Sequence, residues 1–403
     1  MSLARALALG LVASAALSCA RAPRTVQHDR AIGVHAGEIV IGSSAALSGQ
    51  ASFLGTQTIH GSLAKIQEVN AKGGIHGRKV RLVSLDDGYD PARAVTNTQQ
   101  LLADEGVFAL FDYVGTPTSV KIIDLTERAE VPALGFFTGA EPLRTPLRKW
   151  MFHVRDSYYS EAEGAVALLV DRLKFDKIAV LYQEDAFGQA VLAGLQLALK
   201  RRAMTPVAIE TYARGTMDVE RARDALVKSG AQAIAMVGTY APLAKFVKLT
   251  HDAGQRPWFH TVSFVGSEAF AKELVETQKI DPKEYDKIVV TQVVPSPFSD
   301  DYPTVHEYRE LAKKYYPTEA PNYVALEGFL NATVLVRALE AAGPALDRDR
   351  FTAALEHFQG IDLGIGTPLS YTKESHAGLA GIYYSHLEPD STFRLFDPKA
   401  VVR

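Results

Sequence analysis

Cysteine is almost absent from this sequence: Cys19 is the only one among 403 residues, which excludes an intramolecular disulfide and a cysteine-based zinc cluster. The chain also lacks any long basic run, and its formal net charge is −3. Nucleic-acid binding needs clustered lysine and arginine to neutralise phosphates, so this class of partner is excluded. The 11 histidines are scattered without metal-ligand spacing, and we predict no metal site.

Catalytic motifs are missing too. The sequence contains no G-x-S-x-G, H-E-x-x-H or G-x-x-x-x-G-K-[ST]. Asp86-Asp87 and Glu184-Asp185 are pairs of adjacent acids. Adjacent acids in a strand point to opposite faces, and acids in loops are usually solvated, so neither pair suits general acid–base work. We therefore predict a protein that is not an enzyme and needs no cofactor.

The N-terminal residues have the pattern of an export signal. Arg5 precedes an apolar stretch, Ala6 to Leu17, that is too short to span a bilayer. We assign residues 1–18 to a signal peptide and residues 19–37 to a tether. The segment Ala16-Leu17-Ser18-Cys19 resembles a bacterial lipobox, in which the cysteine is lipidated and becomes the mature N-terminus. Ordinary cleavage after Ala20 is the alternative, since a lipobox usually has Leu where Ala16 stands.

The chain from residue 38 onwards alternates between strand and helix patterns. Ile39 to Gly42 are apolar enough for a buried strand, and apolar residues then recur at helical spacing up to Gly73-Gly74. Val80 to Leu85 reads as the next strand, which completes a parallel βαβ unit. The alternation continues through both halves, and the length and the 47% hydrophobic content suit two lobes.

This first unit resembles the periplasmic solute-binding proteins of the leucine/isoleucine/valine-binding family in three sequence segments, EIVIGSSAALSG, NAKGGIHG and DDGYDP. The resemblance extends from Glu38 to about Gly343. It implies an α/β fold with two doubly wound parallel-sheet lobes joined by a multi-crossing hinge, the periplasmic binding protein type I fold. We place lobe 1 at residues 38–154 plus 296–366 and lobe 2 at 155–295 plus 367–403, with crossings at 153–158, 295–297 and 364–368.

The resemblance also implies a ligand site between the lobes. Thr116 in VGTPTS would supply the hydroxyl of the first lobe, and helix capping is its alternative role. The implied main-chain clamp is Phe137, Thr138 and Gly139 in GFFTGA, and Leu54 would be an apolar wall. In the second lobe the implied residues are Phe187 as an aromatic lid, Tyr240 or Thr239 as a wall, Ser263 and Phe264. For Phe187 and Phe264, plain core packing is the alternative.

Ser263 stands where amino-acid binders of the family carry a glutamate that neutralises the ligand's ammonium group. A serine hydroxyl cannot replace a full charge in a poorly hydrated cleft. We therefore expect a carboxylate or a neutral polar head on an apolar or aromatic body, and not a standard α-amino acid. Asp185, Glu184 or Glu268 could still supply the missing charge.

These features predict a monomeric extracytoplasmic solute-binding protein, located in the periplasm or cell envelope as an anchored lipoprotein. It would deliver a small-molecule ligand to ABC permease subunits in the inner membrane. One alternative is a ligand-sensing periplasmic receptor component of a signalling system. Another is an interaction protein, which would have a cleft plugged by side chains.

If Cys19 carries a lipid anchor, Cys19→Ser should release the protein from the membrane fraction. The melting temperature should stay the same, because residues before Glu38 lie outside the expected core. Cell fractionation and thermal unfolding of both forms check this. Unchanged membrane retention of the variant would contradict the lipoprotein assignment.

Overall fold

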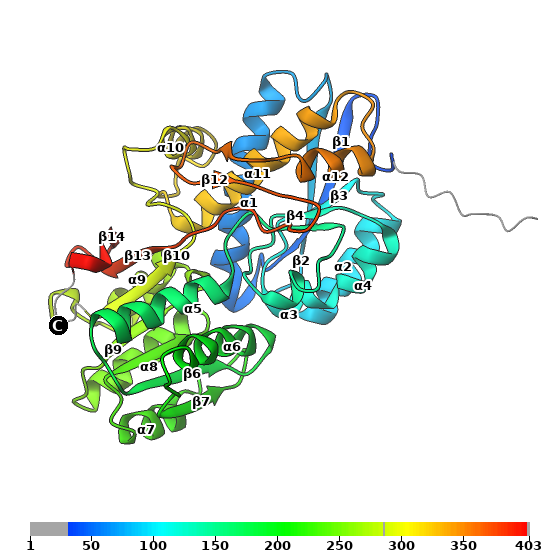
Figure 1. Cartoon of the computed structure of the whole chain (residues 1–403). Helices are drawn as coiled ribbons and strands as arrows, with labels where there is room; N and C mark the ends of the chain where they lie inside the picture. Colours follow the sequence, from blue (N-terminus) through cyan, green and yellow to red (C-terminus); the bar gives the residue numbers. More distant parts are fainter. Residues whose placement is uncertain (1–30, 285–286, 401–403) are drawn as a thin grey trace, which may run out of the picture.

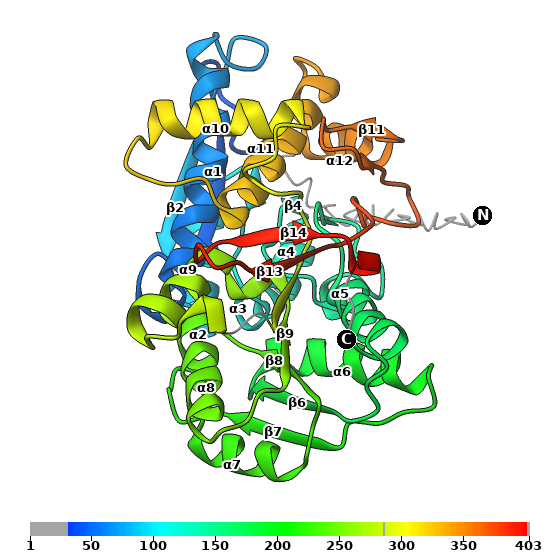
Figure 2. The same ribbon diagram turned by 90° about the vertical axis from the view of Figure 1, so that its left-hand side faces the viewer.

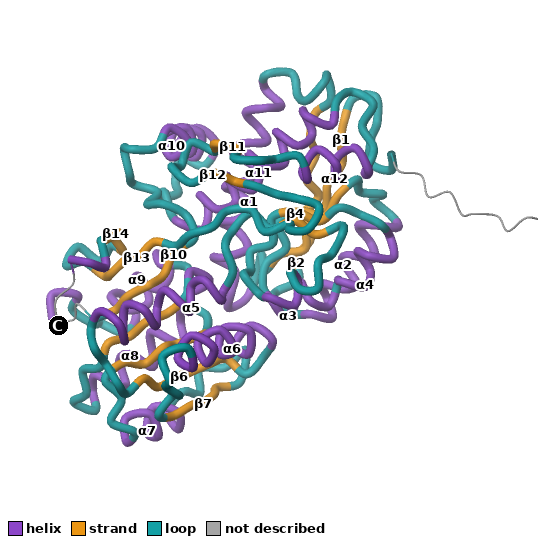
Figure 3. Tube along the Cα trace, in the orientation of Figure 1, coloured by secondary structure: helices purple, strands orange, loops and turns teal. Residues whose placement is uncertain are grey.

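The computed structural model describes residues 31–284 and 287–400, so the signal, tether and Cys19 assignments fall largely outside the described residues. The described chain forms two α/β lobes, one above the other in Figure 1. Figure 3 shows each lobe as strands in orange surrounded by helices in purple.

Lobe 1 is built on a parallel sheet of five strands in the order β2-β1-β3-β4-β5. The strands are β1 (Glu38–Ala45), β2 (Lys79–Asp86), β3 (Ala109–Phe111), β4 (Ala133–Leu134) and β5 (Met151–Phe152). Both faces of β1 are buried, as expected for a parallel sheet. Ile39 and Ile41 pack toward one cluster of the core, whereas Val40 packs with Leu101 on the opposite face.

Helices cover both faces of this sheet. They are α1 (Ser52–Ala71), α2 (Pro91–Ala103), α3 (Thr116–Lys121), α4 (Ile123–Ala129), α10 (Pro303–Tyr315), α11 (Tyr323–Ala342) and α12 (Arg348–Glu356). As expected from the sequence, α1 ends before two glycines at positive φ, Gly73 and Gly74. Helix α2 begins with Asp90, whose carboxylate accepts hydrogen bonds from the amides of Ala92 and Arg93.

Helices α1 and α11 approach each other unusually closely, because both have a glycine at the contact. A Cβ on Gly61 of α1 would lie 1.8 Å from the Ala325 carbonyl oxygen. On α11, a Cβ on Gly328 would lie 2.1 Å from the Thr58 carbonyl oxygen. Ser62 adds a hydrogen bond of 2.7 Å to the Gly328 carbonyl. The C-terminal part of the chain is thereby fixed onto lobe 1.

Lobe 2 has a sheet of seven strands in the order β14-β13-β10-β9-β8-β6-β7. Its parallel strands are β6 (Ile178–Gln183), β7 (Ala208–Tyr212), β8 (Ala233–Val237), β9 (Trp258–Thr261) and β10 (Ile288–Gln292). The antiparallel edge is β13 (Tyr383–Leu387) and β14 (Phe393–Phe396), which lies near the middle of the molecule in Figure 2. Helices α5 (Tyr158–Val166), α6 (Ala186–Lys200), α7 (Glu220–Lys228), α8 (Tyr240–Asp252) and α9 (Ser267–Lys272) complete the lobe.

The third crossing lies further along the chain than the sequence indicated. Residues 364–368 stay in lobe 1, because β12 (Pro368–Leu369) pairs with β11 (Ile361–Asp362), and the Gly364 carbonyl accepts a hydrogen bond from Thr304 of α10. The chain then runs beside the first crossing, where the amides of Gly378 and Leu379 donate to His153 and Val154. It enters lobe 2 only at β13.

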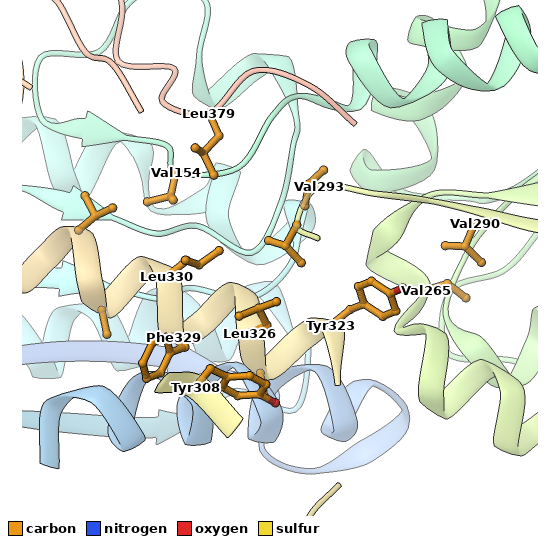
Figure 4. Packing of buried hydrophobic residues seen from close by; sticks show 14 of the residues in the cluster. Val154, Val265, Val290, Val293, Tyr308, Tyr323, Leu326, Phe329, Leu330 and Leu379 are labelled. Atoms are coloured by element: carbon orange, nitrogen blue, oxygen red, sulfur yellow. The ribbon is translucent and has the colours of Figure 1, made fainter. Parts of the chain in front are cut away.

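The two lobes share buried contacts. One apolar cluster is continuous from lobe 1 into lobe 2, and Figure 4 shows Tyr323 at the start of α11 between Leu326 on one side and Val265 on the other. The amide of Tyr323 donates a hydrogen bond of 3.1 Å to Glu268 of α9. The structure is therefore a closed arrangement of the two lobes.

The close contact of α1 and α11 predicts that Gly61→Ala destabilises the protein. Alanine favours helices by up to about 1 kcal/mol over glycine, but overpacking costs about 1–3 kcal/mol when the obstacle is a backbone. We expect a net loss in the free energy of urea unfolding. Gly37→Ala is the matched control, because a Cβ there meets nothing within 4 Å. Equal stability of both variants would contradict this packing.

The burial of Glu268 predicts a pH dependence of stability. Burial raises the pKa of Glu268 from 4.5 to about 7. Between these values the folded protein holds a proton that the unfolded chain has released, so the free energy of unfolding falls as pH rises through this window. Glu268→Gln removes this titration and keeps the acceptor oxygen.

Between about pH 5 and pH 8, the wild type should lose stability relative to Glu268→Gln by on the order of 1 kcal/mol, since the side chain is partly exposed. Urea unfolding at several pH values measures the difference. Parallel pH profiles of the two proteins would show that Glu268 has an ordinary pKa.

Candidate ligand-binding site between the lobes

The predicted site residues lie in loops and helix starts that follow the carboxyl ends of strands in both lobes. Leu54 is in α1 after β1, Thr116 begins α3 after β3, and Phe137, Thr138 and Gly139 follow β4. In lobe 2, Phe187 is in the first turn of α6, Tyr240 begins α8, and Ser263 and Phe264 follow β9. Ligands of open parallel sheets bind at this edge.

Aromatic rings from both lobes meet here. The Phe264 ring centroid lies 4.5 Å from that of Phe187 and 5.6 Å from that of Phe137, which belongs to lobe 1. Tyr158 at the start of α5 packs on Phe187 at 5.4 Å, and Tyr89 of lobe 1 lies 6.1 Å from Phe264. All five rings are buried. We call these residues the interlobe aromatic cluster.

Leu54 and Tyr240 extend this cluster on one side. Leu54 is buried within it, and a Cβ on Gly266 would come within 2.7 Å of the Leu54 side chain. The half-buried Tyr240 ring packs edge-on against Phe53 of α1 at 6.4 Å. The structure thus brings apolar side chains of both lobes together, as their sequence positions implied.

Thr116 does not cap its helix. Gly115 is the residue before the first turn of α3, and the Thr116 hydroxyl instead forms a hydrogen bond of 2.7 Å with the Thr138 hydroxyl. Gly115 has φ of +97°, and a Cβ there would clash with the Tyr89 ring. The loop after β3 is therefore held against the loop after β4, and capping is excluded as the role of the Thr116 side chain.

A buried charge network occupies the junction of the lobes beside the aromatic rings. Arg155, in the first crossing, is 1% exposed. Its Nη2 lies 2.8 Å from Oε1 of Glu161 in α5, and its Nη1 lies 3.4 Å from Oε1 of Glu327 in α11. The guanidinium also lies over the rings of Phe137 and Tyr158, at 5.5 and 5.4 Å. We call Arg155, Glu161 and Glu327 the junction triad.

Ser263 holds Glu161 in place. The Ser263 amide donates to Glu161 Oε2 at 2.8 Å, and the Ser263 hydroxyl donates to Oε1 at 3.0 Å. Thr291 of β10 donates to Oε2 at 2.9 Å. Ser263 also hydrogen-bonds Arg155. Each oxygen of Glu161 therefore has two hydrogen-bonded partners, which satisfies the carboxylate.

Burial controls the protonation of these groups. It raises the pKa of Glu327 to about 7, against the attraction of Arg155. Burial also raises the pKa of Glu161, again opposed by Arg155 and by the hydrogen bonds from Ser263. The two nearby carboxylates raise the pKa of Arg155 despite its desolvation, so its guanidinium remains charged.

None of the three acids that we considered as replacements for a glutamate at position 263 takes that place. Asp185 caps α6 and accepts hydrogen bonds from the amides of Phe187 and Gly188. Glu184 is exposed, and Glu268 accepts from Tyr323. The carboxylate beside Ser263 comes from Glu161, which the sequence analysis missed. Its spacing from the inward residues Tyr158, Ala162 and Ala165 was the available signal.

Several polar groups at this junction have no partner of their own. Arg155 Nε and the hydroxyls of Tyr89 and Tyr158 are buried without a hydrogen bond. The tyrosine hydroxyls lie near Gln183 and Thr138 respectively, without reaching hydrogen-bond geometry. Unsatisfied buried donors are costly, so they are candidates for contacts with a ligand.

Four cavities of the described chain lie elsewhere, and none of them is lined by the predicted ligand residues. In this closed arrangement the aromatic rings fill the space between the loops. A ligand body of more than a few atoms would require the rings or the lobes to move apart. Among the described residues, no group of acidic, histidine or cysteine side chains could hold a metal ion, and no helix has the length and apolar character for a membrane span.

The chain matches the family model described as periplasmic binding protein over residues 38–391. Among curated proteins, it is 24% identical over 340 residues to Leu/Ile/Val-binding protein homolog 3 of Brucella melitensis, covering 83% of this chain and 88% of that protein. The family and these relatives are substrate-binding proteins and not enzymes, in agreement with the missing catalytic motifs.

Solved structures show the same two-lobed type I fold. A possible leucine/isoleucine/valine-binding protein from Rhodopirellula baltica has a TM-score of 0.84 and 31% identity, covering 91% of this chain and 98% of that one. A fatty acid ABC transporter substrate-binding protein from Thermomonospora curvata has a TM-score of 0.79 and 20% identity, with 91% and 93% coverage. The chain thus belongs to the periplasmic binding protein family, in its leucine/isoleucine/valine-binding group.

Proposed function

We propose that this protein binds a small carboxylic acid with an apolar or aromatic body between its lobes and delivers it to an ABC importer. The proposed ligand class rests on the hydrogen bonds that the Glu161 carboxylate already makes. Its carboxylate lies beside Ser263, but both of its oxygens are already occupied by Arg155, Ser263 and Thr291. No oxygen is left there for a ligand's ammonium group.

The other groups at the junction suit a headgroup that accepts hydrogen bonds. Arg155 Nε and the hydroxyls of Tyr89 and Tyr158 are donors without protein partners. A carboxylate can accept several such bonds, and charge-assisted bonds are the stronger ones. The rings of Phe137, Phe187 and Phe264 would then pack on an apolar body.

Membership of the family alone does not determine which polar headgroup the ligand has. The related proteins are named for leucine, isoleucine and valine in some cases and for a fatty acid in another. These two ligand classes share a carboxylate and an apolar body and differ in the ammonium group. The residues around Ser263 favour ligands without it. Delivery to a permease, and anchoring through Cys19, are proposed together with this ligand class.

The first test compares ligands that differ only in the amino group. Calorimetric titration of leucine and valine is set against 4-methylpentanoate and 3-methylbutanoate, with benzoate as an aromatic acid. An unpaired ammonium in a closed cleft costs several kcal/mol, so the amino acids should bind about a thousandfold more weakly or worse. Micromolar binding of leucine or valine would falsify the ligand class. Binding requires the lobes to open and close, so small-angle scattering with and without the acid that binds should give different radii of gyration, and identical radii would contradict the hinge movement.

A variant pair locates the headgroup. Tyr158→Phe removes a hydroxyl that has no protein partner, so it should weaken binding of the acid about three- to tenfold with little change in stability. Tyr308→Phe is the matched control, because the Tyr308 hydroxyl contacts Asn322 and lies outside the interlobe aromatic cluster. It should lower stability and leave binding unchanged. Unaltered binding to Tyr158→Phe would place the headgroup elsewhere.

A further inference from the structure

A cavity of about 410 Å³ opens beside the hinge, outside the interlobe aromatic cluster. Residues of the loop between β4 and β5, of the first crossing and of the third crossing line it. The charged and titratable ones among them are Glu141, Arg144, Arg148, His153, Asp156, Glu374 and His376. We call this space the hinge cavity.

Two crossings form the wall of the hinge cavity. The amide of His153 donates to the His376 carbonyl at 2.9 Å, and the amide of Gly378 donates to the His153 carbonyl at 2.8 Å. The His376 ring is fixed as well, since its Nδ1 lies 3.0 Å from the Met151 carbonyl oxygen. The wall therefore consists of paired backbone and not of a loose loop.

Two arginines line the cavity without an acidic partner. Arg144 Nη2 donates to the carbonyls of Arg155 and Asp156, at 2.8 and 3.3 Å, and its buried Nε has no hydrogen-bond partner. Arg148 Nε donates only to the Pro142 carbonyl, at 3.4 Å. Within the described part of the chain neither guanidinium forms an ion pair. Burial lowers the pKa of Arg144 to about 10, against the attraction of the nearby carboxylates of Glu141 and Asp156, so its charge is poorly solvated.

His153 adds a hydrogen-bond acceptor. The side chain is buried, with 1% of its surface exposed, and its Nε2 lies 3.1 Å from the Leu143 carbonyl oxygen. This contact requires the proton on Nε2, and burial keeps the ring neutral by lowering its pKa. The Nδ1 atom is then an acceptor, and it has no partner in the described structure.

The acids of the lining do not satisfy these groups. Both Asp156 oxygens are occupied, Oδ1 by the Ser157 amide and Oδ2 by the Gly381 amide. Glu374 is exposed and Glu141 half-buried, and neither contacts a guanidinium of the cavity at ion-pair distance. The unmet needs of the cavity are thus anionic partners for Arg144 and Arg148 and a donor for His153.

We propose that the hinge cavity is a second ligand site, which binds a small dicarboxylate carrying a hydroxyl group. One carboxylate pairs with Arg144 and the other with Arg148, and the hydroxyl donates to His153 Nδ1. Charge-assisted contacts to two guanidinium groups give the site its preference for dianions. The site is separate from the cleft, so its occupant need not resemble the transported ligand.

Calorimetric titration of the whole protein with L-malate tests the site. Malate should bind, and Arg148→Gln should weaken its affinity at least tenfold, because one charge-assisted contact is lost. Arg128→Gln is the matched control, since Arg128 is an exposed arginine of α4 in the same lobe. It should bind malate like the wild type. Succinate, which lacks the hydroxyl, should bind several-fold more weakly than malate.

Absence of malate binding overturns the proposal, and so does an equal effect of the Arg148 and Arg128 substitutions. Equal affinity for malate and succinate overturns the contact with His153. If Arg148→Gln does not fold, Arg148→Lys keeps the charge and loses the planar fork, and it should weaken malate binding less than tenfold but measurably. Unchanged affinity in that variant also contradicts the site.

Discussion

The buried guanidinium of Arg155 constrains the junction of the lobes more than any other group. Its charge is removed from water, so it persists only because Glu161 and Glu327 face it from opposite lobes. Leaving one member of such a group unpaired typically costs about 3–5 kcal/mol. The positions of α5, which carries Glu161, and α11, which carries Glu327, are therefore linked through one side chain in the first crossing.

This link bears on how the protein opens. Separation of the lobes would remove Glu327 from Arg155 and admit water to the junction, which lowers the cost of each charge on its own. Burial raises the pKa of Glu327 and of Glu268, and both residues lie where lobe 1 meets lobe 2. Opening should release protons from them, so acidic conditions favour the closed arrangement.

Local sequence patterns were enough to predict most of the strands and helices. The position of the third crossing was predicted wrongly, because it depends on contacts between residues distant in sequence. The strand and helix alternation and the end of α1 before Gly73 and Gly74 depend on neighbouring residues, so the sequence was sufficient for them. The predicted place of the third crossing was wrong because residues near Gly364 are held on lobe 1 by a residue distant in sequence, Thr304 of α10, which donates to the Gly364 carbonyl.

Some residues of the candidate site were likewise predictable from the sequence, and others needed the structure. The resemblance led to Phe137, Phe187 and Phe264, and the structure gathers them. Position 263 needed the fold, because the carboxylate there comes from Glu161, distant in sequence. A serine leaves room for that side chain and donates to it twice, whereas a glutamate would repel it. Since Arg155, Ser263 and Thr291 already occupy both oxygens of Glu161, that carboxylate cannot act as a free glutamate that pairs with an ammonium group, which is the reason for proposing a ligand without one.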